Sequence, residues 1–135
     1  MRRFVLDCSV SAAWCLRDES NQVADRYLAL LADGEAIVPS LWVVEMFNVL
    51  VMAERRRRIS ATDAELALSL LDQLPIVVAE TSMTSMVRIR EQAVDHRLSA
   101  YDAAYLDLAL QRKLPLATLD RTLRHAAKAS GVEWM

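Results

Sequence analysis

Four short apolar runs, separated by longer segments with helical spacing, constrain the fold of this 135-residue chain more than any other feature. The runs lie at residues 4–6, 36–38, 76–78 and 116–118. Between them, apolar residues recur every three or four positions, as they do on one face of a helix. Short apolar strands that alternate with helices predict a parallel sheet covered on both faces, that is, a three-layer α/β/α fold. Residues 132–134 are expected to add an edge strand, which gives a mostly parallel sheet of four to five strands.

Capping residues and glycines predict where the helices begin and end. Ser9 is a candidate N-cap for a helix directly after the first strand, and Gly34 is expected to end the next helix. Only two glycines and three prolines are present, so we expect short loops. We also expect residues 1–135 to form one domain, because the chain has the length of one. The later helices are expected at about residues 20–32, 40–57, 61–71, 81–94, 99–112 and 121–129.

The composition indicates a globular protein of the cytoplasm. Hydrophobic residues make up 54% of the chain and charged residues 25%, and the net charge of −2 does not by itself indicate a nucleic-acid partner. Cys8 and Cys15 are too few for a disulfide framework, and the N-terminal residues do not resemble a signal peptide. The most apolar stretch, residues 41–53, is too short to span a membrane and contains Glu45. We therefore expect no membrane association.

Four carboxylates interrupt otherwise apolar segments and form the strongest functional signal in the sequence. They are Asp7, Glu45, Asp102 and Asp120. Burying an unpaired carboxylate is costly, so such a group is usually protonated, paired or bound to a metal. Two of the acids follow predicted strands, and the other two lie in the first halves of predicted helices. Because these ends of strands and helices meet at the edge where parallel sheets bind ligands, we expect the four acids to converge.

Carboxylates that lie close together require a nearby cation to offset their mutual repulsion. Two carboxylates about 5 Å apart repel by roughly 3 kcal/mol at an effective dielectric constant near 20, so four of them would cost much of the stability of a small domain. A site made only of oxygen ligands favours Mg²⁺ or Mn²⁺ over zinc. Such an ion polarises a phosphodiester and lowers the pKa of an attacking water, so the pattern predicts metal-assisted phosphodiester hydrolysis. Ser9, Asn48 and Thr118 are candidates for polar groups that orient the acids.

Structural roles also remain open for these residues. Asp7 and Asp120 are N-cap candidates, and Asp102 is a first-turn acid of the kind that the helix dipole favours. Thr118 is β-branched and suits a strand. The sequence alone does not decide between these roles and a metal site.

Several neighbouring residues are expected to have no part in the site. Asp107 lies five residues after Asp102, about 140° around the helix, and is expected to face solvent. Tyr101 and Tyr105 are expected to pack rather than to stack on bases. The basic block at residues 55–58 suits either a rim that attracts a polyanion or a solvated helix end.

Four motifs in order carry a resemblance to a known family. They are Phe-Val-Leu-Asp-Cys-Ser at residues 4–9, Glu-Met-Phe-Asn-Val-Leu at 45–50, Ser-Ala-Tyr-Asp-Ala-Ala-Tyr at 99–105 and Ala-Thr-Leu-Asp-Arg at 117–121. Together they resemble the PIN-domain ribonucleases, and they are most similar to the VapC toxins of bacterial toxin–antitoxin pairs. The resemblance extends over essentially the whole chain.

This resemblance implies an endoribonuclease that depends on Mg²⁺, or on Mn²⁺ as a substitute, and that cleaves RNA as the toxin of a toxin–antitoxin pair. It also implies a cognate antitoxin that covers the acidic pocket, and often a homodimer. By resemblance, Asp7, Glu45, Asp102 and Asp120 match the acidic quartet of the family. The accompanying polar positions of the family are matched by Ser9, Asn48 and Thr118.

Two other functions compete with this one. The first is a PIN-like module without catalytic activity that only binds a partner; an intact set of four acids argues against it, because an idle pocket would keep the repulsion without using it. The second is an aspartate-based phosphatase or phosphotransfer domain. Such domains generally need a second acid two residues after the first, and here that position is Ser9.

Overall fold

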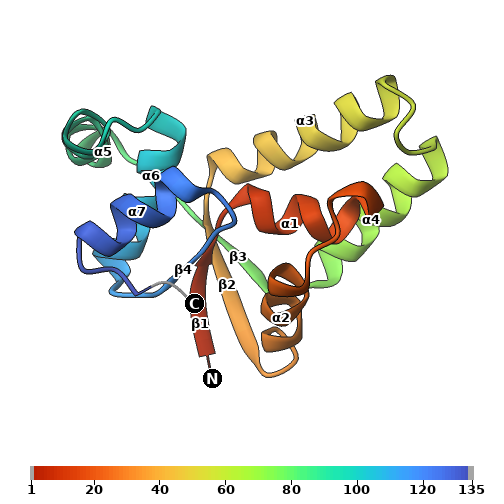
Figure 1. Ribbon diagram of the computed structural model, residues 1–135, viewed down its shortest axis with the longest axis horizontal. Helices are drawn as coiled ribbons and strands as arrows, with labels where there is room; N and C mark the ends of the chain where they lie inside the picture. The colour runs from red at the N-terminus through yellow and green to blue at the C-terminus, as the bar shows by residue number, and fades with distance from the viewer. Residues whose placement is uncertain (1, 134–135) are drawn as a thin grey trace.

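A four-stranded parallel sheet forms the centre of the protein in the computed structural model, which describes residues 2–133 (Figure 1). The strand order is β3-β2-β1-β4, and every pair of neighbours is parallel. The strands are β1 (Arg2–Leu6), β2 (Gly34–Pro39), β3 (Ile76–Ala79) and β4 (Leu116–Ala117). The prediction of an α/β fold with a parallel sheet is confirmed.

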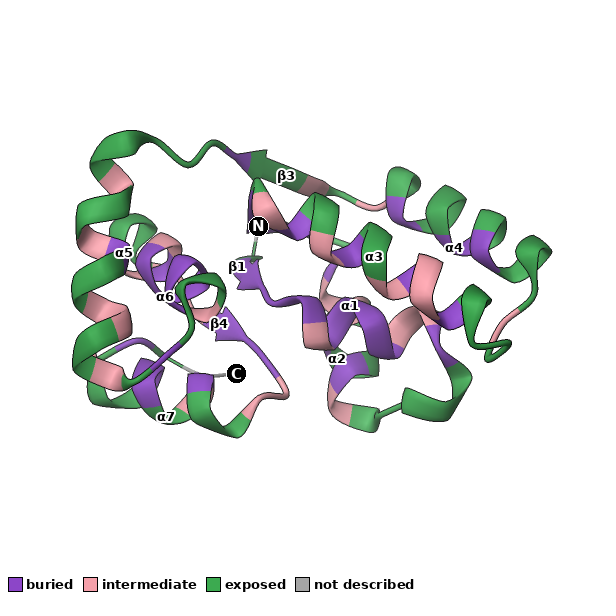
Figure 2. Ribbon diagram, turned by 90° about the horizontal axis from the view of Figure 1, so that it is seen from above, coloured by how far each residue is buried: buried purple, intermediate pink, exposed green. Residues whose placement is uncertain are grey.

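Helices cover both sides of this sheet. In Figures 1 and 2, α1 to α4 lie on one side and α5 to α7 lie on the other, so the sequence of layers is helix, sheet, helix. A short 3-10 helix follows α1 at Arg17–Glu19. The α-helices are α1 (Cys8–Cys15), α2 (Gln22–Leu30), α3 (Leu41–Arg55), α4 (Ala61–Gln73), α5 (Met83–His96), α6 (Ala100–Arg112) and α7 (Arg121–Ala129).

The core forms around the two central strands. Phe4, Val5 and Leu6 of β1 are fully buried, and so is Ile37 of β2. Consecutive residues point to opposite faces of a sheet, so a strand that is buried on both faces needs an uninterrupted apolar run. That requirement explains why the strands are visible in the sequence as short apolar runs rather than as alternating patterns.

The fifth strand is not found among the described residues. The backbone N–H of Leu116 donates to the carbonyl oxygen of Glu133 at 2.9 Å, so the chain after α7 does run beside β4. No strand is formed there up to residue 133, however, and Trp134 lies outside the described residues. The described sheet therefore has four strands.

Gly34 has a different role from the one predicted. Helix α2 ends at Leu30, and Gly34 begins β2 instead of ending the helix. A Cβ atom at this position would lie 2.5 Å from the carbonyl oxygen of Arg2 and 2.7 Å from that of Leu30. Glycine is needed here because two backbone segments approach it closely.

Gly131 closes α7 as a left-handed C-terminal residue, with φ of +78°. Its N–H donates to the carbonyl oxygen of Lys128, and the N–H of Val132 donates to that of Ala127. These two bonds form a Schellman motif, which satisfies carbonyl groups that the helix leaves unpaired.

Within residues 2–133, none of the helices has the length and apolar character needed to cross a membrane.

Candidate active site

The four predicted acids lie on four different elements. Asp7 immediately follows β1, and Asp120 follows β4 and occupies the N-cap position of α7. Glu45 lies in the second turn of α3, and Asp102 lies in the first turn of α6. The N–H of Asp7 donates to the carbonyl oxygen of Ala117 at 3.0 Å, so the ends of β1 and β4 are aligned. This arrangement gives the site its position at the carboxyl edge of the sheet.

Two hydroxyl groups hold the carboxylate of Asp7. Ser9 Oγ donates to Asp7 Oδ2 at 2.6 Å, and Thr118 Oγ1 donates to the same oxygen at 2.7 Å. Each hydroxyl also accepts a backbone N–H: that of Leu119 for Ser9 and that of Asp120 for Thr118, both at 3.0 Å. The side chain of Asp7 is thereby fixed to the loop that carries Asp120.

Burial and bonding act in opposite directions on Asp7. The residue is only 5% exposed, and this desolvation raises the pKa of its carboxyl above the ordinary value of 3.8. The hydroxyls of Ser9 and Thr118 oppose the rise because they donate to the charged form, and the nearby charge of Asp120 adds to it. Asp7 is therefore a buried carboxylate whose ionisation depends on these donors and on any nearby cation.

Ser9 does not cap α1. Asp7 occupies the N-cap position, and no side chain there bonds to the first turn. The hydroxyl of Ser9 is instead committed to Asp7 and to the backbone of Leu119.

The carboxylate of Glu45 is held by Tyr105, which was expected only to pack. The hydroxyl of Tyr105 donates to Glu45 Oε1 at 2.6 Å, and Tyr105 itself is fully buried. Partial burial raises the pKa of Glu45, the Tyr105 hydroxyl opposes that shift, and the charge of Asp7 adds to it. Tyr101, by contrast, is 64% exposed, so the prediction that it packs is wrong.

The charges of all three other acids affect the pKa of Asp102. Desolvation raises its pKa, followed by the charges of Asp7, Asp120 and Glu45, to a value of about 6. The four carboxylates thus share one electrostatic environment although they come from distant parts of the chain.

Asp120 combines a structural role with its place in this group. Its Oδ1 accepts the backbone N–H groups of Thr122 at 2.8 Å and of Leu123 at 3.1 Å, which makes it the N-cap of α7. The cap fixes the orientation of the carboxylate beside the loop that also holds Asp7.

Asn48 is not drawn into this group. It lies one turn after Glu45 on α3, and its side chain is exposed. Its proposed orienting role stays a prediction, whereas Ser9 and Thr118 contact Asp7 directly.

The donor set suits a hard divalent cation. Between residues 2 and 133, no three acidic, histidine or cysteine side chains are arranged to coordinate one ion by themselves. Mg²⁺, however, usually keeps several waters and is held by one or two carboxylates. The residues fit such an ion, because the candidate ligands are all oxygen atoms and the raised pKa values of Asp7, Glu45 and Asp102 record a local excess of negative charge and burial.

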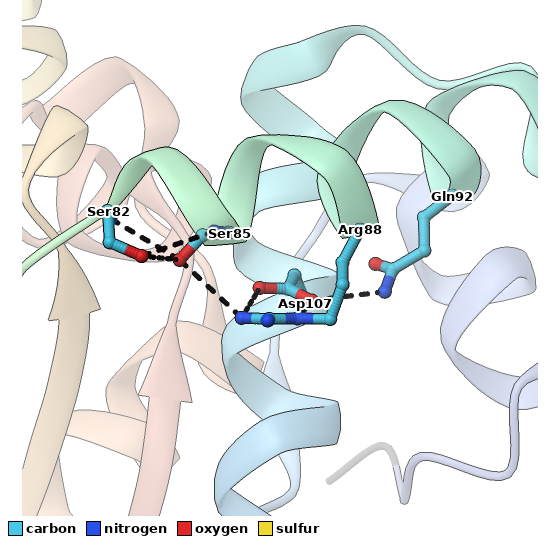
Figure 3. Close-up of polar contacts among 5 residues, drawn as sticks. All are labelled: Ser82, Ser85, Arg88, Gln92 and Asp107. Carbon is cyan, nitrogen blue, oxygen red and sulfur yellow. Dashed lines mark hydrogen bonds and ion pairs between the residues drawn. The ribbon is translucent and has the colours of Figure 1, made fainter.

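The prediction that Asp107 faces solvent is wrong. Asp107 is 4% exposed and accepts bonds from Arg88 Nε at 3.1 Å and from Gln92 Nε2 at 3.2 Å (Figure 3). Its side of α6 packs against α5, so a direction away from Asp102 points to another helix rather than to water. The ion pair fastens α5 to α6.

The basic block at residues 55–58 is partly neutralised by neighbours. Arg58 forms ion pairs with Asp18 at 2.8 Å and with Glu19 at 2.7 Å. Of the two interpretations of this block, the contact supports a structural role for Arg58, because its charge is shared with two acids that follow α1.

Comparisons with known proteins agree with this fold. A family model described as "PIN domain" matches residues 4–129. Among solved structures, the chain is similar to VapBC2 of Rickettsia felis, bound to a DNA fragment from their promoter, with a TM-score of 0.71 and 9% identity over 98% of this chain and 97% of that one.

Two further structures show the same fold. VapC20 of Mycobacterium tuberculosis, described as a toxin that cleaves the sarcin-ricin loop, has a TM-score of 0.68 and 17% identity over 91% of this chain and 94% of that one. FitAcB of Neisseria gonorrhoeae has a TM-score of 0.66 and 19% identity over 98% of this chain and 96% of that one. No curated protein gave a significant match. The family match covers most of the chain and coincides with the strands and helices that carry the four acids, so the chain belongs to the PIN-domain family.

Proposed function

We propose that this protein is a metal-dependent endoribonuclease that acts as the toxin of a toxin–antitoxin pair. The observation that carries the proposal is the grouping of four carboxylates, from four elements, in one electrostatic environment at the carboxyl edge of a parallel sheet. PIN domains are usually metal-dependent nucleases, and a protein with the same fold is described as cleaving the sarcin-ricin loop. We infer an RNA substrate from these two facts.

In this proposal, Asp7, Glu45, Asp102 and Asp120 hold Mg²⁺, or Mn²⁺ in its place, one or two of them directly and the others through waters of the ion. The bound ion would supply Lewis-acid activation of water and stabilisation of the leaving oxygen. The chain itself contributes fixed geometry, because Ser9 and Thr118 hold one oxygen of Asp7. Negative charge at the site also keeps the RNA phosphate away unless a cation is present, which makes cleavage dependent on the metal.

Cleavage of RNA tests the proposal. Purified protein is incubated with total RNA and Mg²⁺ or Mn²⁺, with and without a chelator, and compared with Asp7→Asn. We expect wild-type cleavage that the chelator abolishes, and a loss of at least about 100-fold in Asp7→Asn because an amide oxygen is a weaker ligand than a carboxylate. Asp95→Asn, which changes an exposed acid on α5, is the matched control and should cleave at the wild-type rate.

Two results would contradict the proposal. Cleavage that survives the chelator would exclude the metal from the reaction. A well-folded wild-type protein that binds RNA or a partner but never cleaves would favour the alternative of a PIN-like module without catalytic activity.

We also propose that a cognate antitoxin inhibits the enzyme by covering the acidic pocket. The support is electrostatic: burial first, and then mutual repulsion, raise the pKa values of Asp7, Glu45 and Asp102, and a basic side chain placed beside them would offset both. An antitoxin with a basic residue at its tip would therefore bind in competition with the metal.

A homodimer is the third part of the proposal. Apolar side chains that are 55–78% exposed recur at helical spacing along one side of α5, and we call this surface the α5 face. It consists of Met83, Met86, Val87 and Val94. Exposed apolar patches of this kind mark interaction surfaces. Helix α5 has only one buried residue, Ile89, so most of its apolar surface is left for a partner.

A further inference from the structure

The hydrogen bond between Tyr105 and Glu45 joins two helices that pack mainly against other elements. Helix α3 packs on α1, α4 and β2, whereas α6 packs on α5, α7 and the strands. In Figure 1 the two helices lie on opposite sides of the sheet. The Tyr105 hydroxyl reaches across and donates to Glu45 Oε1 at 2.6 Å.

Tyr105 also belongs to the part of α6 that carries another acid of the site. It follows Asp102 by three residues, which places the two side chains on the same side of the helix. The ring of Tyr105 is fully buried, so its position is set by packing rather than by the hydroxyl. The position of the Tyr105 hydroxyl is therefore fixed, and this hydroxyl sets the orientation of Glu45 relative to Asp102.

We propose that Tyr105 is a positioning residue for the metal site: its hydroxyl fixes one oxygen of Glu45, so that the carboxylate is already oriented before the ion binds. The proposal rests on the metal-binding function proposed above and adds a residue that belongs neither to the four acids nor to their predicted orienting groups Ser9, Asn48 and Thr118. Without the hydroxyl, Glu45 is a flexible side chain in the second turn of α3, and part of the binding free energy is spent on ordering it. Partners that orient metal ligands typically change metal affinity by about 10-fold to 100-fold.

The chain offers a matched control for removal of this hydroxyl. Tyr27 is also buried, with 2% exposure, and among the described residues its hydroxyl has no hydrogen-bond partner. Tyr105→Phe and Tyr27→Phe each remove one oxygen from a buried tyrosine, but only Tyr105→Phe removes a bond to an acid of the site.

The test is the affinity of the full chain for Mn²⁺, measured by titration calorimetry for the wild type, Tyr105→Phe, Tyr27→Phe, Glu45→Gln and the double variant Tyr105→Phe/Glu45→Gln. Urea unfolding without metal confirms that each variant is folded. We expect about 10-fold weaker binding for Tyr105→Phe and less than about 2-fold change for Tyr27→Phe. In the Glu45→Gln background, Tyr105→Phe should add less than about 2-fold, because the carboxylate that the hydroxyl orients is gone.

A second readout separates positioning from chemistry. If the hydroxyl acts only through Glu45 and the ion, RNA cleavage by Tyr105→Phe should be lost at low Mn²⁺ and return to near the wild-type rate when Mn²⁺ saturates the site. Unchanged or tighter Mn²⁺ binding by Tyr105→Phe would overturn the inference, and so would an equal loss in the Glu45→Gln background. Failure of the underlying function looks different, because the wild type itself would then bind no Mn²⁺.

Discussion

The carboxyl of Asp102, like those of Asp7 and Glu45, has a raised pKa that links the stability of the metal-free protein to pH. Its pKa is raised from 3.8 to about 6 by desolvation and by the charges of Asp7, Asp120 and Glu45. Between about pH 4 and pH 6 the folded state holds a proton that the unfolded state has released, so the free energy of unfolding should fall as pH rises through this window. The penalty is complete about one unit above this pKa, near pH 7.

We expect this dependence to appear in urea unfolding at pH 4, 5, 6 and 7 with a chelator present. Asp102→Asn should flatten the slope between pH 4 and pH 6 and stabilise the metal-free protein at pH 7, whereas Asp95→Asn should keep the wild-type slope. Mg²⁺ at pH 7 should stabilise the wild type more than Asp102→Asn. Asp18 and Asp63 act in the opposite sense because their pKa values are lowered, but their contributions are nearly constant above about pH 5. Stability that rises from pH 4 to pH 6 would contradict the shared environment.

The acids could be recognised from the sequence because a carboxylate inside an apolar run is costly wherever it occurs. The same reasoning placed Asp7 and Asp120 correctly at the ends of strands. It could not find the role of Tyr105, because a tyrosine in an apolar run is explained by packing alone, and its hydroxyl partner lies 60 residues away. The three-residue spacing from Asp102 was the only available signal.

At the scale of the element, α5 depends on a polar contact for its attachment. Arg88 and Gln92 of α5 donate to Asp107 of α6, and only Ile89 of this helix is buried (Figure 3). This contact contributes more than a fully exposed ion pair, because the Asp107 carboxylate is buried while the Arg88 side chain is 36% exposed.

We expect Asp107→Ala to lower the free energy of unfolding by about 2 kcal/mol, the cost of removing charged hydrogen bonds from a buried site. Hydrogen exchange should accelerate in α5 more than in β1 or β2, because the loss is local to the α5–α6 contact. Asp95→Ala, at an exposed position of α5, is the control and should change stability by less than about 0.5 kcal/mol. Uniform exchange across the molecule would show that the contact does not hold α5.

The elements themselves were more predictable than their ends. The seven α-helices of the described residues were anticipated because apolar spacing marks them. The predicted cap Ser9 does not cap α1, whereas Ser60, Ser82 and Ser99 cap α4, α5 and α6. The prediction for Gly34 was wrong because a glycine after a helical segment can either end the helix or allow a close approach of backbone segments in the next strand. Only the close approach of the Arg2 and Leu30 carbonyls, which depends on the strand pairing, decides between them.

At the scale of the whole molecule, the α5 face predicts self-association. A stable interface needs roughly 800 Å² from each partner, and four apolar side chains that are more than half exposed provide its apolar centre. We expect Val87→Glu to convert a dimer to a monomer, since it places a carboxylate in the centre of this face, as measured by light scattering after size exclusion. Leu66→Glu is the matched control: this residue of α4 is 64% exposed, like Val87 at 63%, but lies outside the face. A wild type that is monomeric at about 100 μM would contradict the prediction.

The hydrogen bonds around Asp7 also determine at which stage of translation the acidic site can form. The hydroxyls that hold the Asp7 carboxylate belong to Ser9, which follows β1, and to Thr118, which follows β4. The first and the last strands along the chain must therefore pair before this carboxylate is fixed. A nascent chain that has emerged only as far as α6 carries three of the four acids but lacks both Thr118 and Asp120. Translation therefore completes the acidic site only near its end, and a product that terminates before Thr118 lacks it.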